Sequence, residues 1–294
     1  MSLQQLESLI QKLKAAPVDP TATFQRRRGA MEKAAFRLDA DIKAEPLTAN
    51  GVPAEWITAP GADPGRNVLY LHGGGYTIGS IKTHRCLAGW VSRAAAARVL
   101  IIDYRLAPEH PFPAAVDDAL AAYRFMLDSG VKPSRTVVAG DSAGGGLTVA
   151  ALLAIRDAKL PLPGAAVCLS PWVDLEGTGE SMKTKADADP MVSGGNLGDM
   201  AAAYLGGKDP KTPLASPLHA DLRGLPPMLI QVGTAEVLLD DSKRLAERAS
   251  AAGVEAIYEP WENMIHVWQI FVPMLDESKQ AVERVGQYIR EKTP

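Results

Sequence analysis

Three short apolar runs constrain the fold of this chain more than any other feature of its sequence. Val68–Leu71, Val99–Ile102 and Met228–Ile230 are apolar at every position. A strand covered on one face alternates apolar and polar side chains, whereas a strand covered on both faces is apolar throughout. The runs therefore predict an α/β fold, in which a mostly parallel sheet carries helices on both of its faces.

Further strands and helices alternate along most of the 294 residues, which is typical of a doubly wound sheet. The predicted strands are Ile42–Thr48, Glu55–Ala59, Asn67–Leu71, Val99–Tyr104, Thr136–Ala139, Ala165–Leu169, Met228–Val232 and Ala256–Tyr258. The predicted helices are His84–Ala97, Ala114–Ser129, Ala143–Lys159, Asp241–Ala252 and Val267–Lys292. Asn50-Gly51 favours a hairpin between the first two strands, because it is a strong turn dipeptide.

One region interrupts this alternation. Residues 176–217 are rich in Gly, Pro, Asp and Ser, and only a short helix around Leu197–Leu205 is predicted there. An irregular segment of this length inside a compact domain is usually functional or an insertion. We therefore expect residues 176–217 to form a cap, joined by N-terminal cap helices in residues 1–40. The α/β core then comprises residues 41–175 and 218–294.

A G-x-S-x-G element, Gly140-Asp141-Ser142-Ala143-Gly144, lies between a predicted strand and a predicted helix. In that context the motif forms a sharp turn that exposes the serine Oγ at the carboxyl edge of the sheet. Small neighbours are needed because side chains there would clash, and the helix N-terminus favours developing negative charge. A glycine-rich turn with an N-cap serine is the alternative, but it leaves the motifs described next unexplained. We predict Ser142 as a nucleophile.

A second glycine-rich segment, His72-Gly73-Gly74-Gly75, follows the predicted strand Asn67–Leu71. Acyl transfer passes through a tetrahedral oxyanion, and each preorganised N–H donor contributes about 3–4 kcal/mol to its stabilisation. We predict an oxyanion hole formed by the backbone N–H groups of Gly74, Gly75 and Ala143, with His72 in a structural role. A phosphate-binding loop is disfavoured, since G-x-G-x-x-G and a P-loop lysine are both missing.

A serine nucleophile needs a base that takes its proton. In this fold the chain order is nucleophile, acid, histidine, and His266 is the only histidine that follows the predicted strand Met228–Val232. An acid just beyond that strand would orient the histidine and stabilise its protonated form. Glu236 is nearest to the strand end, while Asp240 and Asp241 come a turn later and could instead cap the next helix.

Taken together, these motifs resemble those of the hormone-sensitive lipase family of bacterial esterases, within the α/β hydrolases. The resemblance spans roughly residues 40–290 and is carried by His72–Gly75, Asp103–Glu109, Phe112–Asp118, Gly140–Gly145 and Ile265-His266. It implies an eight-stranded sheet, a cap built from the N-terminus and an insertion, and hydrolysis of short acyl esters without a cofactor.

The family usually carries its acid in an Asp-Pro-Leu-x-Asp segment, where this chain reads Glu236-Val237-Leu238-Leu239-Asp240. The resemblance therefore assigns the acid to Glu236, with Glu in place of Asp and with the proline lost. Both carboxylates can serve a histidine, but Glu is one methylene longer, so its loop must be placed differently. Asp240 would keep an auxiliary role. Arg105 and Glu109 are expected in buried ion pairs or as loop-fixing groups, and Asp141 is expected to be structural.

The expected activity is that of a carboxylester hydrolase that uses a Ser-His-Glu triad and an acyl-enzyme intermediate. An amidase or deacetylase with the same triad is one alternative. A non-catalytic small-molecule-binding protein of the same fold is another, and it is disfavoured because all three triad residues are present. The predicted apolar lining of the substrate pocket is Tyr76, Met200, Tyr204, Leu205 and Ile265.

Charge and composition argue against several other classes of protein. With 31 basic and 34 acidic residues, the formal charge of −3 gives no electrostatic reason to expect a nucleic-acid partner. No apolar run approaches the ~20 residues that span a membrane. The N-terminus lacks the regions of a secretion signal, and helical spacing there predicts an amphipathic helix, at Leu3, Leu6, Ile10 and Leu13.

These features predict a cytoplasmic enzyme without stable membrane association. Cys86 and Cys168 lie in apolar elements and are expected as buried thiols rather than a disulfide. The five histidines are not spaced as a metal site, so no metal or other cofactor is expected. The expected partner is a small-molecule ester, and an exposed edge strand at Ala256–Tyr258 could support a homodimer.

Overall fold

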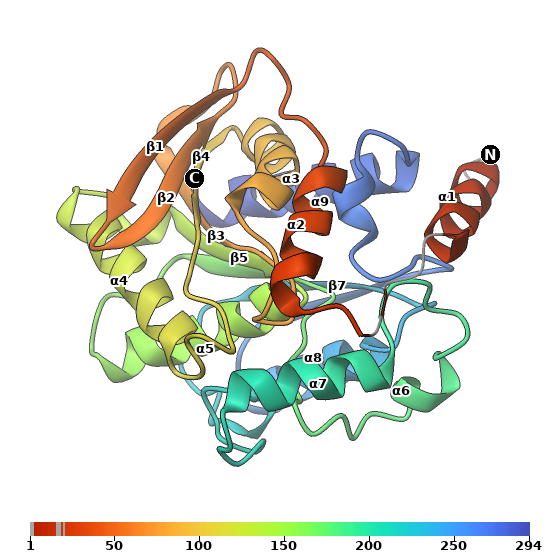
Figure 1. Ribbon diagram of the computed structural model, residues 1–294. Coiled ribbons are helices and arrows are strands. Elements are labelled where there is room, and N and C mark those ends of the chain that lie inside the picture. The colour runs from red at the N-terminus through yellow and green to blue at the C-terminus, as the bar shows by residue number, and fades with distance from the viewer. Residues whose placement is uncertain (1–2, 16–18, 20) are drawn as a thin grey trace.

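A single eight-stranded sheet with helices on both faces forms the core of the computed structural model, which describes residues 3–15, 19 and 21–294 (Figure 1). The strands are β1 (Lys43–Ala49), β2 (Val52–Thr58), β3 (Asp63–Leu71), β4 (Ala97–Ile102), β5 (Thr136–Asp141), β6 (Ala165–Leu169), β7 (Met228–Gly233) and β8 (Ala256–Trp261). The helices are α1 (Leu3–Ala15), α2 (Phe24–Ala34), α3 (Ile81–Ala95), α4 (Ala114–Asp128), α5 (Ala143–Asp157), α6 (Ser181–Thr184), α7 (Gly194–Leu205), α8 (Leu239–Ala251) and α9 (Asp276–Lys292). Short 3₁₀ helices are η1 (Pro133–Arg135), η2 (Pro217–His219) and η3 (Trp268–Phe271).

The strands are arranged in the order β1-β2-β4-β3-β5-β6-β7-β8. Only β2 runs against its neighbours, and every pair from β4 to β8 is parallel. The predicted hairpin joins β1 to β2, with Asn50 and Gly51 both at positive φ, as its tight turn requires. The eight-stranded, mostly parallel sheet that the sequence predicts is confirmed.

The apolar runs occupy the centre of the sheet, and their alternate residues serve opposite faces. Leu69 and Leu71 of β3 belong to the apolar cluster under α4, α5 and α8, whereas Val68 and Tyr70 belong to the cluster under α3 and α9. All four side chains are fully buried. Because each face of the strand meets a layer of helices, no position in the run can be polar, which explains the pattern in the sequence.

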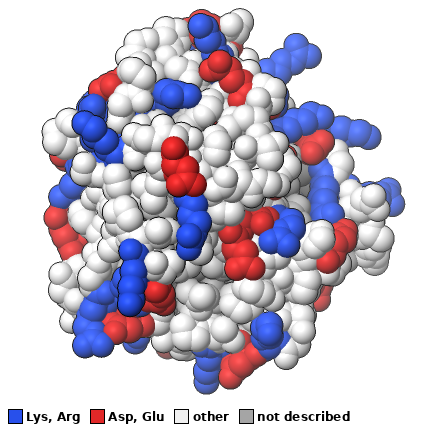
Figure 2. Space-filling view, turned by 90° about the vertical axis from the view of Figure 1, so that its left-hand side faces the viewer, with Lys and Arg blue, Asp and Glu red and all other residues white. Residues whose placement is uncertain are grey.

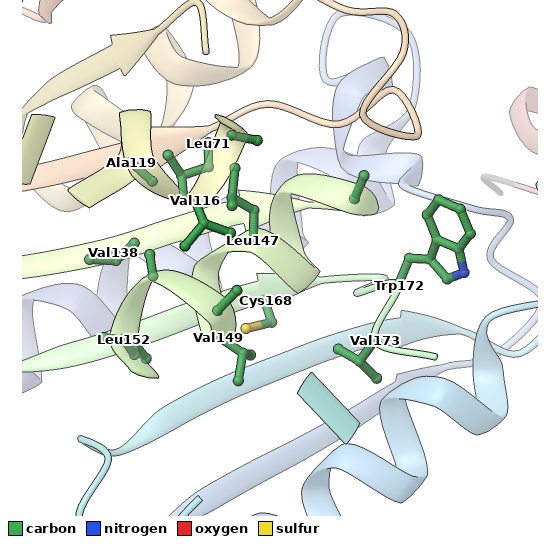
Figure 3. Close-up of a cluster of buried hydrophobic side chains, with 14 of the residues drawn as sticks. Leu71, Val116, Ala119, Val138, Leu147, Val149, Leu152, Cys168, Trp172 and Val173 are labelled. Carbon is green, nitrogen blue, oxygen red and sulfur yellow. The ribbon is translucent and has the colours of Figure 1, made fainter. Parts of the chain in front are cut away.

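Helix α5 is buried deeply enough to fix the strand-to-helix turn at its start. Figure 3 shows its residues Leu147, Val149 and Leu152 among side chains from β5, β6 and α4. Gly146, in its first turn, comes so close to the backbone of Trp172 that a Cβ there would collide with the Trp172 carbonyl. The helix is therefore positioned by close backbone contact as well as by apolar packing.

The predicted helix Val267–Lys292 was wrong at its start, because α9 begins only at Asp276. Val267 has a left-handed backbone conformation, with φ 46°, and η3 follows it. Trp268 and Phe271 are buried in a third apolar cluster together with Leu6 and Leu9 of α1, among others. The chain therefore turns after His266 to pack these rings, and this packing overrides the helical spacing of the sequence. The predicted amphipathic helix is confirmed, since Leu6, Ile10 and Leu13 of α1 all pack on this cluster.

Residues 176–217 contain α6 and α7, so this segment is more ordered than its composition indicates. Figure 1 shows α7 lying next to α2 in the lower front of the molecule. The guanidinium group of Arg28 in α2 donates hydrogen bonds to the carbonyls of Thr77 and Ala107 and pairs with Glu109 at 2.7 Å. Residues 1–2, 16–18 and 20 of the predicted N-terminal cap lie outside the described residues.

The two polar residues expected to fix the loop after β4 do so at the surface rather than in the interior. Arg105 pairs with Asp118 at 2.8 Å, and Glu109 pairs with Arg28. The side chains of Arg105 and Glu109 are each about half exposed. Of the two expected roles, the loop-fixing contacts are present, whereas neither pair is a buried ion pair.

Neither cysteine forms a disulfide, and both are buried, as predicted. Burial raises the pKa of the Cys168 thiol to about 12. Among residues 3–15, 19 and 21–294, no helix is long and apolar enough to cross a membrane. Figure 2 shows basic and acidic side chains interspersed over the face that it presents.

The contact between α3 and α9 predicts an unusual sensitivity at Gly286. A Cβ built there would collide with the backbone of Ala94, so Gly286→Ala should lower the free energy of unfolding by about 1–2 kcal/mol despite its better helix propensity. Gly198→Ala is the control, because that helical glycine has open space around it. It should be neutral or stabilising by up to about 1 kcal/mol. Equal stabilities of the two variants in urea denaturation would contradict this interpretation of the packing.

Candidate active site

Ser142 occupies the turn between β5 and α5 in a strained backbone conformation, with φ 53° and ψ −121°. Non-glycine residues rarely adopt positive φ unless their surroundings impose it. Here the Ser142 N–H donates to the carbonyl of Leu169 at 2.8 Å, and the Ser142 carbonyl accepts from Gly146 and Trp172. Backbone contacts with β6 and the segment after it therefore hold the serine in place.

The glycines around Ser142 are required by close backbone contacts. A Cβ on Gly140 would collide with the Gly144 carbonyl, and one on Gly144 would collide with the carbonyl of Leu71 at the end of β3. Such contacts can be relieved only by moving backbone, because no flexible side chain is involved. The positions of the glycines in the motif therefore follow from the close packing of the β5–α5 turn against the end of β3.

The structure brings Ser142, His266 and Glu236 into one hydrogen-bonded array. His266 Nε2 lies 2.9 Å from Ser142 Oγ, and His266 Nδ1 lies 2.8 Å from Glu236 Oε2. The three residues are between 0 % and 8 % exposed. They come from three different loops. Because each ring nitrogen of His266 has its own partner, only one orientation of the ring allows both hydrogen bonds.

Glu236 is the only one of the three acid candidates that reaches His266. It follows β7, and its second oxygen, Oε1, accepts the Gly233 N–H at 3.2 Å. Asp240 instead accepts the Ser181 N–H, and Asp241 accepts the N–H groups of Val173 and Asp174. Asp240 and Asp241 lie in the first turn of α8, so their carboxylates fix neighbouring loops.

Burial and charge act against each other in the pair of His266 and Glu236. Burial raises the pKa of Glu236, and the neighbouring His266 offsets this in part. Burial alone would lower the pKa of His266, but the charge and hydrogen bond of Glu236, with the charges of Asp189 and Asp141, raise it above its ordinary value. The pair is thus built to stabilise a proton on the imidazole ring.

The loop after β3 presents backbone N–H groups beside Ser142. Gly74 and Gly75 have positive φ values of 120° and 60°, and both border a cavity together with Ser142. The N–H groups of Gly74, Gly75 and Ala143 donate to no acceptor within the described part of the chain. Three N–H groups without internal partners next to a serine hydroxyl form a site suited to a negatively charged oxygen.

Asp141, which precedes Ser142, holds the glycine loop in place. It accepts hydrogen bonds from Gly73 N–H and the Tyr70 hydroxyl, and its other oxygen lies 3.2 Å from His84 Nε2. His72 stacks on Tyr104 with ring centroids 4.2 Å apart. Burial, with the neighbouring His84, lowers the pKa of His72 to about 3, so this ring is neutral at physiological pH. These contacts are those of structural groups.

The cavity beside Ser142 has a volume of about 580 Å³ and is bordered mainly by apolar side chains. One wall comes from α2 and the residues before it, and another comes from α7. Its apolar lining includes Leu13, Ala22, Ala30, Met31, Ala34, Ile78, Met191, Val192, Leu197, Met200, Val267 and Ile270.

Of the five residues predicted to line the pocket, only Met200 borders this cavity. Tyr76 and Tyr204 stack on each other at 3.7 Å instead, with both rings buried. Leu205 and Ile265 are buried in two separate apolar clusters. These four side chains pack against other buried side chains and so do not face the cavity.

The N-terminal helices were expected to join the cap, but no residue of α2 was predicted to line the cavity. Ala30, Met31 and Ala34 of this helix all border it. Their spacing places them on one helical face, but the helix sequence FQRRRGAMEKA is dominated by charged and small residues. Ala30 and Ala34 four residues apart were the only available signal for an apolar face.

Within the described residues, one group of side chains has the composition and closeness of a metal site, namely Asp174, Glu176 and His219. Asp174 already pairs with Arg244 at 3.0 Å, and Glu176 pairs with Lys211 at 3.5 Å. Both carboxylates are thus partnered by cations of the chain itself. This cluster is separate from the residues that border the cavity of Ser142.

The fold and this array place the chain among the α/β hydrolases, and comparison with known proteins agrees. A family model described as alpha/beta hydrolase fold matches residues 68–270. The chain belongs to the hormone-sensitive lipase family of this fold, and it is a serine carboxylesterase.

Relatives of known name cover most of this chain. An acetyl-hydrolase of Streptomyces hygroscopicus is 50% identical over 247 residues, which cover 84% of this chain and 82% of the relative. An esterase of Acinetobacter venetianus is 35% identical over 254 residues, covering 86% and 84% of the two chains.

Solved structures extend the similarity over nearly the whole chain. A crystal structure of an esterase from the bacterial hormone-sensitive lipase family has 53% identity, 99% coverage of both chains and a TM-score of 0.97. A hormone-sensitive lipase from a metagenome library has 40% identity, 98% coverage of both chains and a TM-score of 0.95.

Proposed function

We propose that Ser142, His266 and Glu236 form the catalytic triad with which this esterase hydrolyses short-chain acyl esters. The observation that carries the proposal is the pair of hydrogen bonds on His266, at 2.9 Å to Ser142 Oγ and 2.8 Å to Glu236 Oε2. This geometry allows one imidazole to accept the serine proton while the carboxylate holds it in the required tautomer.

In the proposed reaction, Ser142 Oγ attacks the ester carbonyl carbon while His266 Nε2 takes the hydroxyl proton. The tetrahedral intermediate then collapses, and His266 donates that proton to the departing alcohol. Water, deprotonated by His266, attacks the acyl-enzyme in the same way and releases the carboxylic acid and Ser142. The raised pKa of His266 favours the protonated ring that each of these steps requires.

The negative charge of each tetrahedral intermediate is assigned to the N–H groups of Gly74, Gly75 and Ala143. In support, these donors have no other acceptor among the described residues. They can therefore bind the negatively charged oxygen without breaking another hydrogen bond. Asp141 fixes the preceding Gly73 N–H at 3.1 Å, which holds the loop in its active shape before substrate arrives. Preorganisation of this kind is usually a large part of the catalytic effect.

We also propose that the N-terminal helices and residues 176–217 act as the cap of the site. In support, α2 and α7 border the same cavity as Ser142. Met200 of α7 packs over Gly75, where an added Cβ would collide with its sulfur atom. The cap would thereby limit the space next to the proposed oxyanion hole.

Short acyl groups are favoured because the cavity must hold both the acyl and the alcohol portions of the ester. The name of the acetyl-hydrolase relative supports the same preference. With p-nitrophenyl esters from C2 to C16, kcat/KM should therefore peak at C2 to C6 and fall for longer chains. Matched p-nitroanilides should be poor substrates. Activity that rises steadily to C16 would contradict the proposal, and faster cleavage of the anilides would assign the enzyme to amides.

Ser142→Ala should lower kcat for p-nitrophenyl acetate by about 10³- to 10⁶-fold, because the nucleophile is lost. Stability should change little, since the Ser142 backbone contacts remain available to alanine. Circular dichroism and urea denaturation provide the folding control. A correctly folded Ser142→Ala variant that keeps most of the activity would exclude the proposed nucleophile.

Glu236→Gln should lower kcat by about 10²- to 10⁴-fold. Glu236 raises the pKa of His266, so its loss should lower that pKa. The low-pH limb of kcat/KM, where protonated His266 is inactive, should then move to lower pH. Asp240→Asn, in the first turn of α8, is the matched control, because an amide oxygen can still accept the Ser181 N–H. It should change kcat by less than about threefold, and the reverse ranking would reassign the acid.

A further inference from the structure

The peptide groups on either side of the Val237 Cα are held by the segment between β6 and α7. The Val237 N–H donates to Asp189 Oδ2 at 3.1 Å, and the Val237 carbonyl accepts from Ser181 Oγ at 2.6 Å. Val237 directly follows Glu236, and Val237, Asp189 and Ser181 are at most 7 % exposed. The backbone next to the proposed catalytic acid is therefore fixed by two buried polar groups from a distant part of the chain.

Ser181 and Asp189 are each held by further hydrogen bonds. Ser181 N–H donates to Asp240 Oδ2 at 2.8 Å, and Asp240 N–H donates to Ser181 Oγ at 3.1 Å. The other oxygen of Asp189 accepts the N–H groups of Met191 at 2.9 Å and Val192 at 3.0 Å. Because Met191 and Val192 border the cavity of Ser142, one carboxylate connects the cavity wall to the loop that carries Glu236.

The sequence gives this contact a specific reason. At position 237 the chain carries Val, whose N–H needs an acceptor because it is buried. An unpaired buried N–H costs about 1–3 kcal/mol. Asp189 supplies that acceptor.

The charge of Asp189 also acts on the array. The charged groups that act on His266 are Glu236, Asp189 and Asp141, and each favours the protonated ring. Asp189 also disfavours the ionised form of Glu236. A carboxylate on the Val237 N–H thus affects both members of the pair without touching either of them.

We propose that Asp189 is a positioning residue of this esterase, which holds the Glu236 loop against the cavity wall and so keeps the Glu236 carboxylate in place on His266. The inference rests on the proposed triad and adds to it. It predicts that catalysis depends on a side chain that contacts none of the reacting groups. It also predicts that the positional and electrostatic parts of this dependence can be separated.

The test uses the full-length enzyme, p-nitrophenyl acetate and three substitutions. Asp189→Asn removes the charge and keeps one acceptor oxygen, while its NH2 group replaces the other acceptor oxygen. It should lower kcat by about 10-fold and move the low-pH limb of kcat/KM down by about half a pH unit, since His266 loses a stabilising charge. Asp189→Ala should lower kcat by about 10- to 100-fold, with KM within threefold. Ser181→Ala, which loosens Val237 without a change of charge, should lower kcat and leave the pH limb in place.

Asp199→Asn is the matched control, because Asp199 is an exposed carboxylate of α7 with no hydrogen bond to the acid loop. It should leave kcat and the pH profile unchanged. If Asp189→Asn matches this control in both measurements, the inference is wrong. If Asp189→Ala does not fold, Asp189→Asn and Ser181→Ala decide the question. A fully active Glu236→Gln variant would overturn the proposed triad, whereas an inactive one beside an unaffected Asp189→Asn would overturn only this inference.

Discussion

The sharp turn at Ser142 is the constraint on which the rest of this structure depends. A φ of 53° at a serine is unfavourable in isolation, so the turn exists only because its surroundings impose it. The Ser142 N–H donates to the Leu169 carbonyl, and the Ser142 carbonyl accepts from the Trp172 N–H. These bonds hold the serine backbone, while glycines allow α5 to approach β3. Strain stored here projects Oγ toward His266, and the buried sheet and α5 supply the stability that keeps it there.

Burial gives the array at Ser142 its electrostatic character. In water, the attraction between a carboxylate and an imidazolium is weak, but the interaction strengthens as water is excluded. Glu236 is fully buried and retains hydrogen-bond partners in Gly233 N–H, His266 and Ser170. Burial disfavours the negative charge of Glu236, but it also strengthens the interaction of that charge with the His266 ring. Asp141 and Asp189 add to the effect from two sides, so the proton affinity of His266 depends on several loops.

Features that depend on short segments of the sequence could be predicted, whereas features that depend on contacts between distant residues could not. The sheet, Ser142 and the glycine loop follow from short segments whose patterns are local, and the structure confirms the fold. His266 and Glu236 could be selected because chain order in this fold limits the candidates, and the structure brings both to Ser142. The cavity lining could not be predicted. Tyr76 and Tyr204 are apolar enough to line a pocket, but whether they do depends on their stacking with each other, which no local pattern encodes.

The segment Glu236-Val237 shows how buried polar contacts support the loop that follows β7. The N–H and the carbonyl of Val237 are buried and both need partners, so the loop needs support from outside it. The contacts of Asp189 and Ser181 with Val237 provide it. Met191 and Val192 border the cavity and donate their N–H groups to the same Asp189. The cavity wall and the loop that carries Glu236 are therefore connected through one carboxylate. A substitution in that wall should therefore alter turnover as well as substrate binding, since it can shift Glu236 relative to His266.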